Sequence, residues 1–203
     1  MPRKPRENVE NGIYHVYARG NGKQVIFRDD RDRLAYLSLL SEVVDHHELR
    51  CLAYCLMDNH IHLVLETPLA NLSFGMQALH SEYAQNFNER HDRVGHLFQG
   101  RYGAVRIKTD AQLWTVLAYI AANPVEAGLV EKPEAWRWSS YAAVIGPAPL
   151  PRLLDWPHLR SYLQPDHTGA IARYRRLVEG ARALASAFTE SDPAASLCKG
   201  SDP

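Results

Sequence analysis

The chain has 203 residues, of which 46% are hydrophobic and 23% are charged, and 23 basic residues balance 23 acidic ones. This length and composition predict a globular protein with one main domain and an appendage, and they exclude global disorder. With a formal net charge of zero, any binding of nucleic acid has to rely on local basic patches, because domains that bind phosphates non-specifically usually carry a positive excess.

The first part of the chain has the pattern strand, helix, strand, strand. Residues 13–19 alternate apolar and mixed side chains and end at a Gly-Asn-Gly turn signal, which predicts a strand. Residues 29–47 carry leucines and valines at spacings of three and four behind an aspartate-rich start, which predicts an amphipathic helix. Residues 49–66 predict two strands joined tightly at Asp58-Asn59, or one long strand with a bulge there.

A helix, a strand and a helix follow. Residues 71–91 have apolar side chains at helical spacing, and the second half of segment 97–108 has strand character. A third helix is predicted from Asp110 to about Ala122. The Asn123-Pro124 pair should end it, because the residue before a proline disfavours the α region.

This order of elements predicts the fold class. The order β, α, β, β, α, β, α is the split βαβ pattern of an α+β, ferredoxin-like (RRM-like) antiparallel sheet with helices on one face, followed by an added helix. Beyond it, recurring prolines between Pro147 and Pro157 indicate a linker, and residues 171–188 predict a separate amphipathic helix. Residues 147–203 therefore form a proline-rich linker and a C-terminal helical extension with a polar tail that we expect to fray.

Hydropathy and cysteine content indicate the compartment. No stretch approaches 18 uninterrupted apolar residues, and the charged segment 1–8 has no apolar run behind it, so neither a membrane span nor a secretion signal is expected. The three cysteines are an odd number, and Cys51 and Cys55 lie in an apolar run, which indicates reduced thiols in a cytoplasmic protein. Four residues apart in one strand, these two are separated by about 13 Å, too far to share a zinc ion.

The segment Asn59-His60-Ile61-His62-Leu63 places two histidines in a predicted strand. Successive side chains of a strand point to opposite faces, so His60 and His62 project from the same face, roughly 7 Å apart. Two imidazoles on one face can share a cation. Because the pattern is short, two histidines in ordinary structural roles remain an alternative.

The third predicted helix offers a phenol and an amide. Tyr119 lies beside the centre of the apolar face, and Asn123 stands about one turn later on the same stripe, so the two side chains can face one site. A tyrosine at such a position also serves a structural role when its ring packs and its hydroxyl stays in water.

Two glycine-containing segments, 20–22 and 95–103, lie among basic and aromatic residues. Glycines let a backbone approach a ligand closely, and arginine, lysine and tyrosine side chains suit phosphate contact and base stacking. Ordinary turns would have the same sequence, so this alternative stays open. The candidate DNA contacts are Arg19, Asn21, Arg101, Tyr102, Arg106 and Lys108.

Five segments occur in a fixed order along the chain: YHVYARGN at 14–21, AYCLMDNHIHL at 53–63, GHLFQGRY at 95–102, YIAANPVEAG at 119–128 and WSSY at 138–141. Together they resemble the tyrosine transposases of the His-hydrophobic-His (HUH) type, which are IS200-like, and in particular the REP-associated tyrosine transposases of bacteria. The resemblance covers about residues 8–146 and makes that range the transposase domain.

The resemblance implies a mechanism and a substrate. It implies that Tyr119 is the catalytic nucleophile and that His60, His62 and Asn123 bind Mg²⁺ or Mn²⁺. An enzyme of this kind cleaves and rejoins single-stranded DNA at palindromic, REP-like hairpins through a 5′-phosphotyrosine link. It acts as a monomer or homodimer in the bacterial cytoplasm, at the nucleoid.

Two other functions remain open. One is a binding module that holds nucleic acid without cutting it, such as an RRM-like sheet or a domesticated transposase. The other is a metal-dependent hydrolase in which water attacks and Tyr119 is structural. The presence of both histidines and Tyr119 argues against lost chemistry, and the lack of the usual paired aromatics on the strands argues against RNA binding. Formation of a covalent protein–DNA adduct separates all three.

Overall fold

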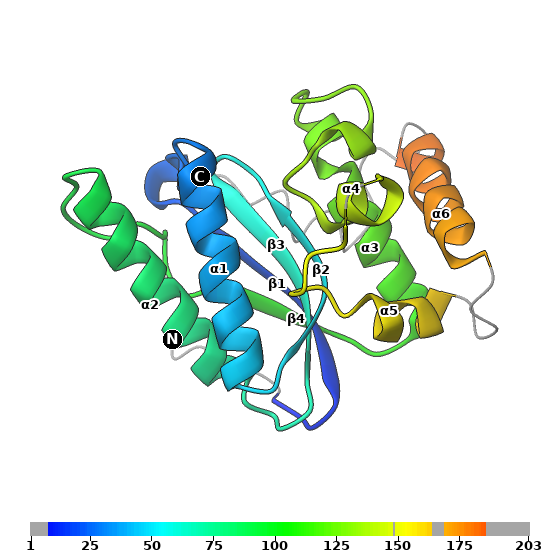
Figure 1. Ribbon diagram of the computed structural model, residues 1–203, viewed down its shortest axis with the longest axis horizontal. Coiled ribbons are helices and arrows are strands. Elements are labelled where there is room, and N and C mark those ends of the chain that lie inside the picture. The colour runs from blue at the N-terminus through cyan, green and yellow to red at the C-terminus, as the bar shows by residue number, and fades with distance from the viewer. Residues whose placement is uncertain (1–7, 148, 164–168, 186–203) are drawn as a thin grey trace.

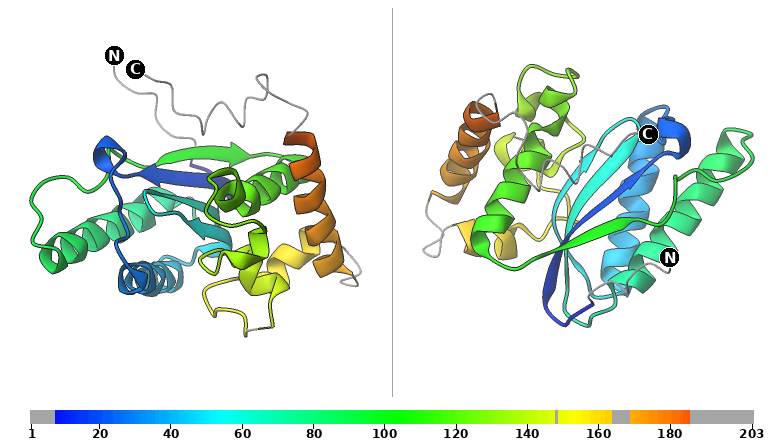
Figure 2. Two further views of the ribbon diagram at one scale, coloured as in Figure 1. Left: turned by 90° about the horizontal axis from the view of Figure 1, so that it is seen from above. Right: turned by 180° about the vertical axis from the view of Figure 1, so that it is seen from behind.

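The computed structural model describes residues 8–147, 149–163 and 169–185 (Figure 1). Its core elements are β1 (Gly12–Arg19), α1 (Asp30–His46), β2 (Arg50–Leu56), β3 (His60–Thr67), α2 (Leu72–Arg90), β4 (Gly103–Ile107) and α3 (Asp110–Glu126). The strands form one antiparallel sheet in the order β2-β3-β1-β4. Helices α1 and α2 pack on one face, and α3 packs on the other (Figure 2). The predicted α+β, ferredoxin-like fold with an added helix is confirmed.

Strand β1 shows how the sequence divides the two faces. Its even-numbered residues Tyr14, Val16 and Ala18 are buried in the core beneath α1 and α2. Because side chains alternate along a strand, His15, Tyr17 and Arg19 point to the opposite face, toward α3. The site described below lies on that second face.

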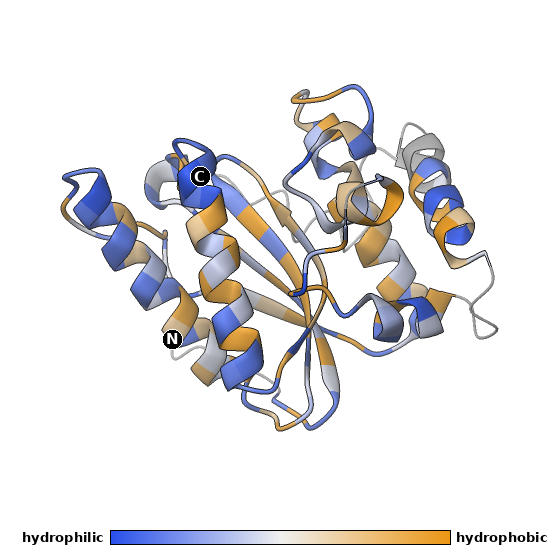
Figure 3. Ribbon diagram, viewed as in Figure 1, coloured by the Kyte–Doolittle hydropathy of each residue, from blue (hydrophilic) through white to orange (hydrophobic). Residues whose placement is uncertain are grey.

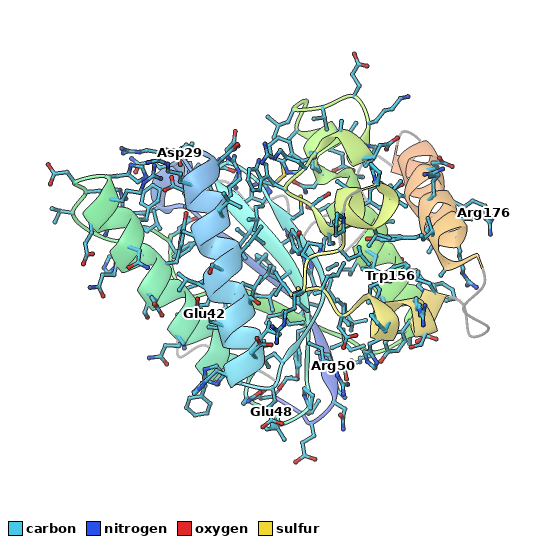
Figure 4. All side chains as sticks on the ribbon, viewed as in Figure 1. Asp29, Glu42, Glu48, Arg50, Trp156 and Arg176 are labelled. Atoms are coloured by element: carbon cyan, nitrogen blue, oxygen red, sulfur yellow. The ribbon has the colours of Figure 1, made fainter. Side chains whose placement is uncertain are left out.

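Helix α1 is amphipathic and well capped. It begins after Asp29 (labelled in Figure 4), whose carboxylate accepts the backbone N–H of Asp32. Such a cap satisfies one of the amides that the first turn leaves without a partner. The buried side chains of α1 include Tyr36, Leu40 and Val43. Figure 3 shows the resulting alternation of hydrophobic and hydrophilic residues around the helix.

The connection between β2 and β3 is a tight turn, so the first of the two alternatives for residues 49–66 is correct. The N–H of Met57 donates to the carbonyl of His60 at 2.9 Å. The carbonyl of Asp58 accepts the N–H groups of Ile26 (2.8 Å) and Phe27 (3.2 Å). The Asp58 carboxylate pairs with Arg33 of α1. The turn that precedes His60 is therefore fixed from two sides. The irregular pairing in this hairpin lies elsewhere, between residues 51 and 53 of β2.

The predicted end of the third helix at Ala122 was wrong, because α3 continues through Pro124 to Glu126. Proline disfavours the α region at the preceding residue but does not forbid it. The helix is closed by Gly128, two residues beyond its last residue, whose φ of +69° suits glycine. The N–H of Gly128 donates to the carbonyl of Val125, and the N–H of Leu129 donates to the carbonyl of Pro124, both at 2.9 Å. This pair of bonds is a Schellman motif, which satisfies the last carbonyls of the helix. As a result, Asn123 lies within the helix.

Residues after α3 pack back onto it. They form a 3₁₀ turn (Pro133–Ala135), α4 (Ser140–Ile145), α5 (Trp156–Leu163) and α6 (Ala170–Ala185), and α6 lies beside α3 (Figure 2). Tyr174 and Val178 of α6 are buried in the same core as Leu117 and Ile120. The predicted helix 171–188 is confirmed as far as residue 185, whereas its last residues and the tail lie outside the described residues.

Residues of the predicted linker contact the sheet and begin a helix. Leu154 is buried and forms a bridge with Cys51 of β2, and α5 already begins at Trp156. His158 of α5 lies 2.6 Å from Glu66, which also accepts from Arg50 at 2.7 Å (Figure 4 labels Arg50 and Trp156). The division into residues 8–146 and 147–203 stays a prediction. None of the helices in the described ranges combines the length and apolarity that a membrane span needs.

His80 of α2 makes the core sensitive to acid. Its ring stacks on Phe98 with centroids 4.3 Å apart, and its Nε2 lies 3.3 Å from the hydroxyl of Tyr36. Burial lowers the pKa of His80 to about 3, whereas an unfolded chain keeps a histidine pKa of about 6.5. The unfolded chain therefore takes up this proton first as the pH falls. Stability is lost progressively from about pH 6.5 down to about pH 3.

We expect His80→Gln to reduce this acid sensitivity. Each pKa unit of difference corresponds to about 1.4 kcal/mol, so the wild type should lose about 3 kcal/mol more than the variant between pH 7 and pH 4. Urea unfolding of both proteins at the two pH values measures the difference. Parallel loss of stability in wild type and variant would contradict this role of His80.

Candidate active site

The two histidines of the His-x-His segment lie at the start of β3, on the face toward α3. Their ring centroids are 5.0 Å apart and their planes are almost perpendicular, at 84°. His62 is only 3% exposed, and His60 is half-buried. Burial lowers the pKa of both imidazoles, and the nearby Arg19 guanidinium lowers that of His60 further. Both rings are therefore neutral near pH 7, the form in which histidine binds a metal.

Helix α3 brings Tyr119 and Asn123 to these histidines. The side-chain N–H of Asn123 donates to the Tyr119 hydroxyl at 3.0 Å. The Oδ1 atom of the same amide lies 3.1 Å from His60 Nε2. The Tyr119 ring meets that of His62 edge to face, with centroids 5.5 Å apart. One amide thus joins the phenol of α3 to the histidines of β3.

The hydrogen bonds around His60 leave a place suited to a cation. Asn59 donates its side-chain N–H to the carbonyl of Lys23 at 3.1 Å, so its Oδ1 accepts the Nδ1–H of His60 at 2.7 Å. The lone pair of His60 Nε2 then faces the Oδ1 of Asn123, and two acceptors stand opposite each other at 3.1 Å. Adjacent metal ligands, each about 2.1 Å from an ion and at right angles, lie about 3 Å apart. This pair fits a shared ion.

His62 points to the same conclusion. Its Nε2 is buried and has no hydrogen-bond partner within residues 8–147, 149–163 and 169–180. Buried polar atoms in proteins almost always have a partner, so an unpaired one calls for an explanation such as an ion. No group of three or more His, Cys, Asp or Glu side chains in the described chain is arranged to hold a metal. A cation at this place would need a ligand of another kind beside the two histidines, and the amide oxygen of Asn123 is the candidate that lies next to His60.

His15 is a neighbour of the site that the sequence analysis missed. Its Nε2 lies 3.0 Å from His62 Nδ1, and its ring centroid is 6.3 Å from that of Tyr119. Burial lowers the pKa of His15 to about 4, so the ring is neutral near pH 7. The only sequence signal was its position on β1, which places it on the same face as Tyr17 and Arg19. The pairing register that brings it beside His62 is not visible in the sequence.

The side chains of His60, His62, Tyr119 and Asn123 line a cleft of about 350 Å³. Three further side chains of this cleft, those of Tyr17, Gln99 and Glu126, were not singled out from the sequence. Glu126 lies three residues after Asn123 on α3, and a helix that ended at Ala122 would not have included it. The complete lining is Tyr17, Ala18, Arg19, His60, Ile61, His62, Gln99, Tyr119, Asn123, Glu126 and Ala127.

The basic candidates for DNA contact do not form one group. Arg19 lines the cleft, and its Nε is buried without a hydrogen-bond partner among the described residues. Arg106 and Lys108 instead line a second cleft, of about 380 Å³, near Gly12 at the other end of β1. The two ends of this strand are about 20 Å apart at roughly 3.3 Å per residue.

The remaining candidates are Asn21, Arg101 and Tyr102. Asn21 and Arg101 are exposed. Tyr102 is only 6% exposed, because its ring packs in the core with an edge toward His80, at a centroid distance of 6.3 Å. The ring of Tyr102 is thus not presented to a base in this structure.

Known proteins resemble this chain in sequence and fold. The sequence model of the family described as "Transposase IS200 like" matches residues 8–123. A putative REP-associated tyrosine transposase of Haemophilus influenzae is 26% identical over an alignment 117 residues long, which covers 52% of this chain and 66% of the relative. The match thus spans slightly less than two thirds of that relative.

Two solved structures were also compared. A REP-associated tyrosine transposase bound to a REP hairpin has a TM-score of 0.58 and 17% identity, over 74% of this chain and 90% of the other, and it shares the fold. A putative transposase of Deinococcus radiodurans has a TM-score of 0.41 and 20% identity, over 55% and 91%. The family match covers more than half of the 203 residues. It agrees with the predicted resemblance, and the chain belongs to the IS200-like transposase family.

Proposed function

We propose that this protein cleaves and rejoins single-stranded DNA at palindromic hairpins through a covalent bond between Tyr119 and the 5′-phosphate. The observation that carries the proposal is the amide of Asn123, which donates to the Tyr119 hydroxyl at 3.0 Å while its oxygen faces His60 Nε2 at 3.1 Å. A candidate nucleophile and a candidate metal site are thereby joined through one side chain. Covalent catalysis requires such an oriented nucleophile.

The hairpin substrate is supported by the relatives. The solved structure that shares this fold holds a REP hairpin, and the Haemophilus relative is named as REP-associated. We therefore propose REP-like single-stranded hairpins as the DNA partner and the bacterial cytoplasm, where the nucleoid lies, as the place of action. Arg19, whose buried Nε has no partner among the described residues, is the basic group placed to contact a phosphate in the cleft.

The cation would be held by His60, His62 and Asn123. Two observations support this set: the Nε2 of His62 lacks a partner in the part of the chain that the structure describes, and acceptors of His60 and Asn123 face each other. When bound, a divalent cation polarises the scissile phosphate and favours attack by the phenol oxygen. Both Mg²⁺ and Mn²⁺ serve this purpose, and two imidazoles with one amide suit Mn²⁺ better than Mg²⁺, which prefers carboxylates and water.

The protein's own groups account for the bond changes. The Tyr119 oxygen attacks the phosphorus, an O–P bond to tyrosine forms, and the bond from phosphorus to O3′ breaks. The proton lost by the phenol balances the proton gained by the 3′-OH that leaves. The N–H that Asn123 donates to the Tyr119 oxygen orients it and stabilises its negative charge. Attack by a 3′-OH on the phosphotyrosine reverses these changes and rejoins the strand.

The proposal is tested with an end-labelled hairpin that carries a single-stranded flank, incubated with the protein and Mn²⁺ or Mg²⁺. A denaturant-resistant protein–DNA band and a fragment with a free 3′-OH are expected. Binding without any cleavage would instead identify a non-cleaving module. Cleavage that releases a free 5′-phosphate and never gives the covalent band would identify a hydrolase that uses water.

A further prediction concerns His15 as a positioning residue. If His62 offers its Nε2 lone pair to the ion, its Nδ1–H donates to His15 Nε2, which lies 3.0 Å away. Removal of a residue that hydrogen-bonds to a metal ligand typically weakens metal binding by roughly 10–100-fold. We therefore expect His15→Leu to weaken Mn²⁺ binding by that factor, whereas His15→Gln, which keeps an acceptor, loses only a few-fold.

Calorimetric titration of Mn²⁺ measures the two affinities, and thermal melting checks that both variants fold. Exposed His46 at the end of α1 gives a matched control, since His46→Leu should bind Mn²⁺ like the wild type. Wild-type affinity in His15→Leu would show that the contact with His62 does not position the ligand.

A further inference from the structure

Tyr17 presents a half-buried aromatic ring in the cleft beside Tyr119, and the proposed mechanism gives this ring no role. It lies in β1, opposite His62 of β3 on one side and Gly103 of β4 on the other. Its ring centroid is 5.6 Å from that of His15. The ring thus lies on the sheet surface, directly beside the candidate metal site.

Gly103 creates the space in which this ring lies. A Cβ atom at Gly103 would come within 2.2 Å of Tyr17 Cζ and 2.6 Å of its hydroxyl oxygen, distances that real Cβ atoms essentially never show. The φ angle of Gly103 lies outside the left-handed region, so the backbone does not require glycine there. The ring of Tyr17 does, because its outer end occupies the place that a Cβ atom of residue 103 would take, as aromatic residues do when they cover a glycine across a strand pair.

Two polar residues, Gln99 and Arg19, line the same cleft as Tyr17 and are held next to each other by the backbone. The N–H of Gln99 donates to the carbonyl of Arg19 at 2.9 Å, and Gly20 pairs with Phe98 in an isolated bridge. These bonds fix Gln99 and Arg19 next to each other at the cleft. Gln99 is exposed and can donate to and accept from the edge of a base. Arg19 brings a positive charge and a buried Nε–H for which the described residues offer no acceptor.

The size of the cleft limits what can enter. Its volume of about 350 Å³ is at the lower end of the range of about 300–1,000 Å³ found for small-ligand sites. A single nucleotide suits this volume, whereas a base pair with its two backbones does not. Aromatic faces bind unpaired bases by stacking, and every base has such a face.

We propose that Tyr17, Gln99 and Arg19 form a subsite for one unpaired nucleotide next to the scissile phosphate. The base stacks on Tyr17, its edge contacts Gln99, and its phosphate contacts Arg19. Gly103 leaves the space that the ring occupies, and so it keeps the ring in the position from which it meets the base. This inference rests on the proposed function and adds to it the recognition of a nucleotide outside the hairpin stem.

The experiment measures binding of a fluorescent hairpin with a single-stranded flank, without divalent cation so that no cleavage occurs. Loss of one stacked base typically weakens binding by about 10-fold or more, so Tyr17→Leu should weaken it by that factor, whereas Tyr17→Phe should keep most of the affinity. Gly103→Ala should weaken binding as well, although Tyr17 is intact, because the new methyl group displaces the ring. Gly180→Ala on α6 is the matched control, since nothing lies within 4 Å of a Cβ there and the residue does not line the cleft.

An abasic scan of the flank identifies the nucleotide. Removal of the base that stacks on Tyr17 should weaken binding to the wild type by about 10-fold but add little to the loss in Tyr17→Leu, because the two changes remove the same contact. Wild-type affinity in Tyr17→Leu, or fully additive losses at every flank position, would overturn the subsite while leaving the proposed function intact. Failure of the wild type to bind any hairpin would instead count against the proposed function itself.

Discussion

Tyr119→Phe is expected to abolish the covalent protein–DNA product completely while hairpin binding persists. The substitution removes only the hydroxyl that attacks phosphorus, and the ring can keep its edge-to-face contact with His62. Loss of the hydrogen bond from Asn123 costs about 1 kcal/mol of folding stability, which the fold should tolerate. The assay is a denaturing gel of the end-labelled hairpin, with binding measured separately by anisotropy.

Tyr83 and Tyr102 are the alternative nucleophiles that this assay has to consider. Tyr83 is 1% exposed and donates its hydroxyl hydrogen to the carbonyl of Ile26 at 2.6 Å, and burial raises its pKa. Tyr102 is buried as well. Neither lines the cleft. Tyr162→Phe, on α5 outside the cleft, is the control that should cleave like the wild type. A full-strength covalent band in Tyr119→Phe would show that another group attacks.

His62→Ala is expected to abolish cation-dependent cleavage and to weaken Mn²⁺ binding by more than the roughly 10–100-fold that an outer-shell partner contributes. The side chain supplies the buried Nε2 that has no hydrogen-bond partner among the described residues and that marks the site. Hairpin binding without cation should persist, because Arg19 and the sheet surface supply the phosphate and base contacts. His60→Ala should behave alike, and Asn123→Ala should weaken Mn²⁺ binding less, since an amide is a poorer ligand than imidazole.

Calorimetric titration of Mn²⁺ into the three variants gives the ranking. Thermal melting separates loss of the ligand from loss of the fold, which matters for buried His62 because its truncation leaves a cavity. His80→Gln provides a control in which another buried histidine of the core is replaced. Unchanged Mn²⁺ affinity in either His60→Ala or His62→Ala would remove the basis for a metal site.

The sequence was sufficient to predict those contacts of the site that depend only on how side chains repeat along one strand or one helix. The His-x-His spacing in a strand required both rings to share a face, and the spacing of four in a helix placed Asn123 beside Tyr119. The structure brings these four residues together, within 3.1 Å for the pair His60 and Asn123. The order of strands and helices was likewise enough to predict the ferredoxin-like fold.

Contacts that depend on pairing between elements were not predictable in the same way. His15 meets His62, and Tyr17 lies over Gly103, only because of the register of β1 against β3 and β4. A shift of one residue would send each side chain to the other face. Tyrosine is a residue type that stacks on bases, but Tyr102 is buried because it packs against His80 of α2. This packing between elements cannot be read from the local sequence.

The C-terminal end of α3 shows a third limit of prediction from the sequence, in which two local signals disagree. A local rule about the residue before proline predicted a stop at about Ala122, whereas α3 continues to Glu126 and is closed by hydrogen bonds from the N–H groups of Gly128 and Leu129. Both signals are present in the sequence, and the Schellman motif outweighs the proline bias. The consequence is functional, because the last turn of the helix carries Asn123 and adds Glu126 to the lining of the cleft.

Peptide mapping of the covalent product tests the central claim most directly. The wild type is incubated with a hairpin and Mn²⁺, the adduct is digested with protease and nuclease, and the peptides are sequenced by mass spectrometry. We predict a single modified peptide in which Tyr119 carries a nucleotide through its 5′-phosphate. A nucleotide attached to Tyr83, Tyr102 or any other residue, or hairpin cleavage without a modified peptide, would contradict the assignment of Tyr119 as the nucleophile.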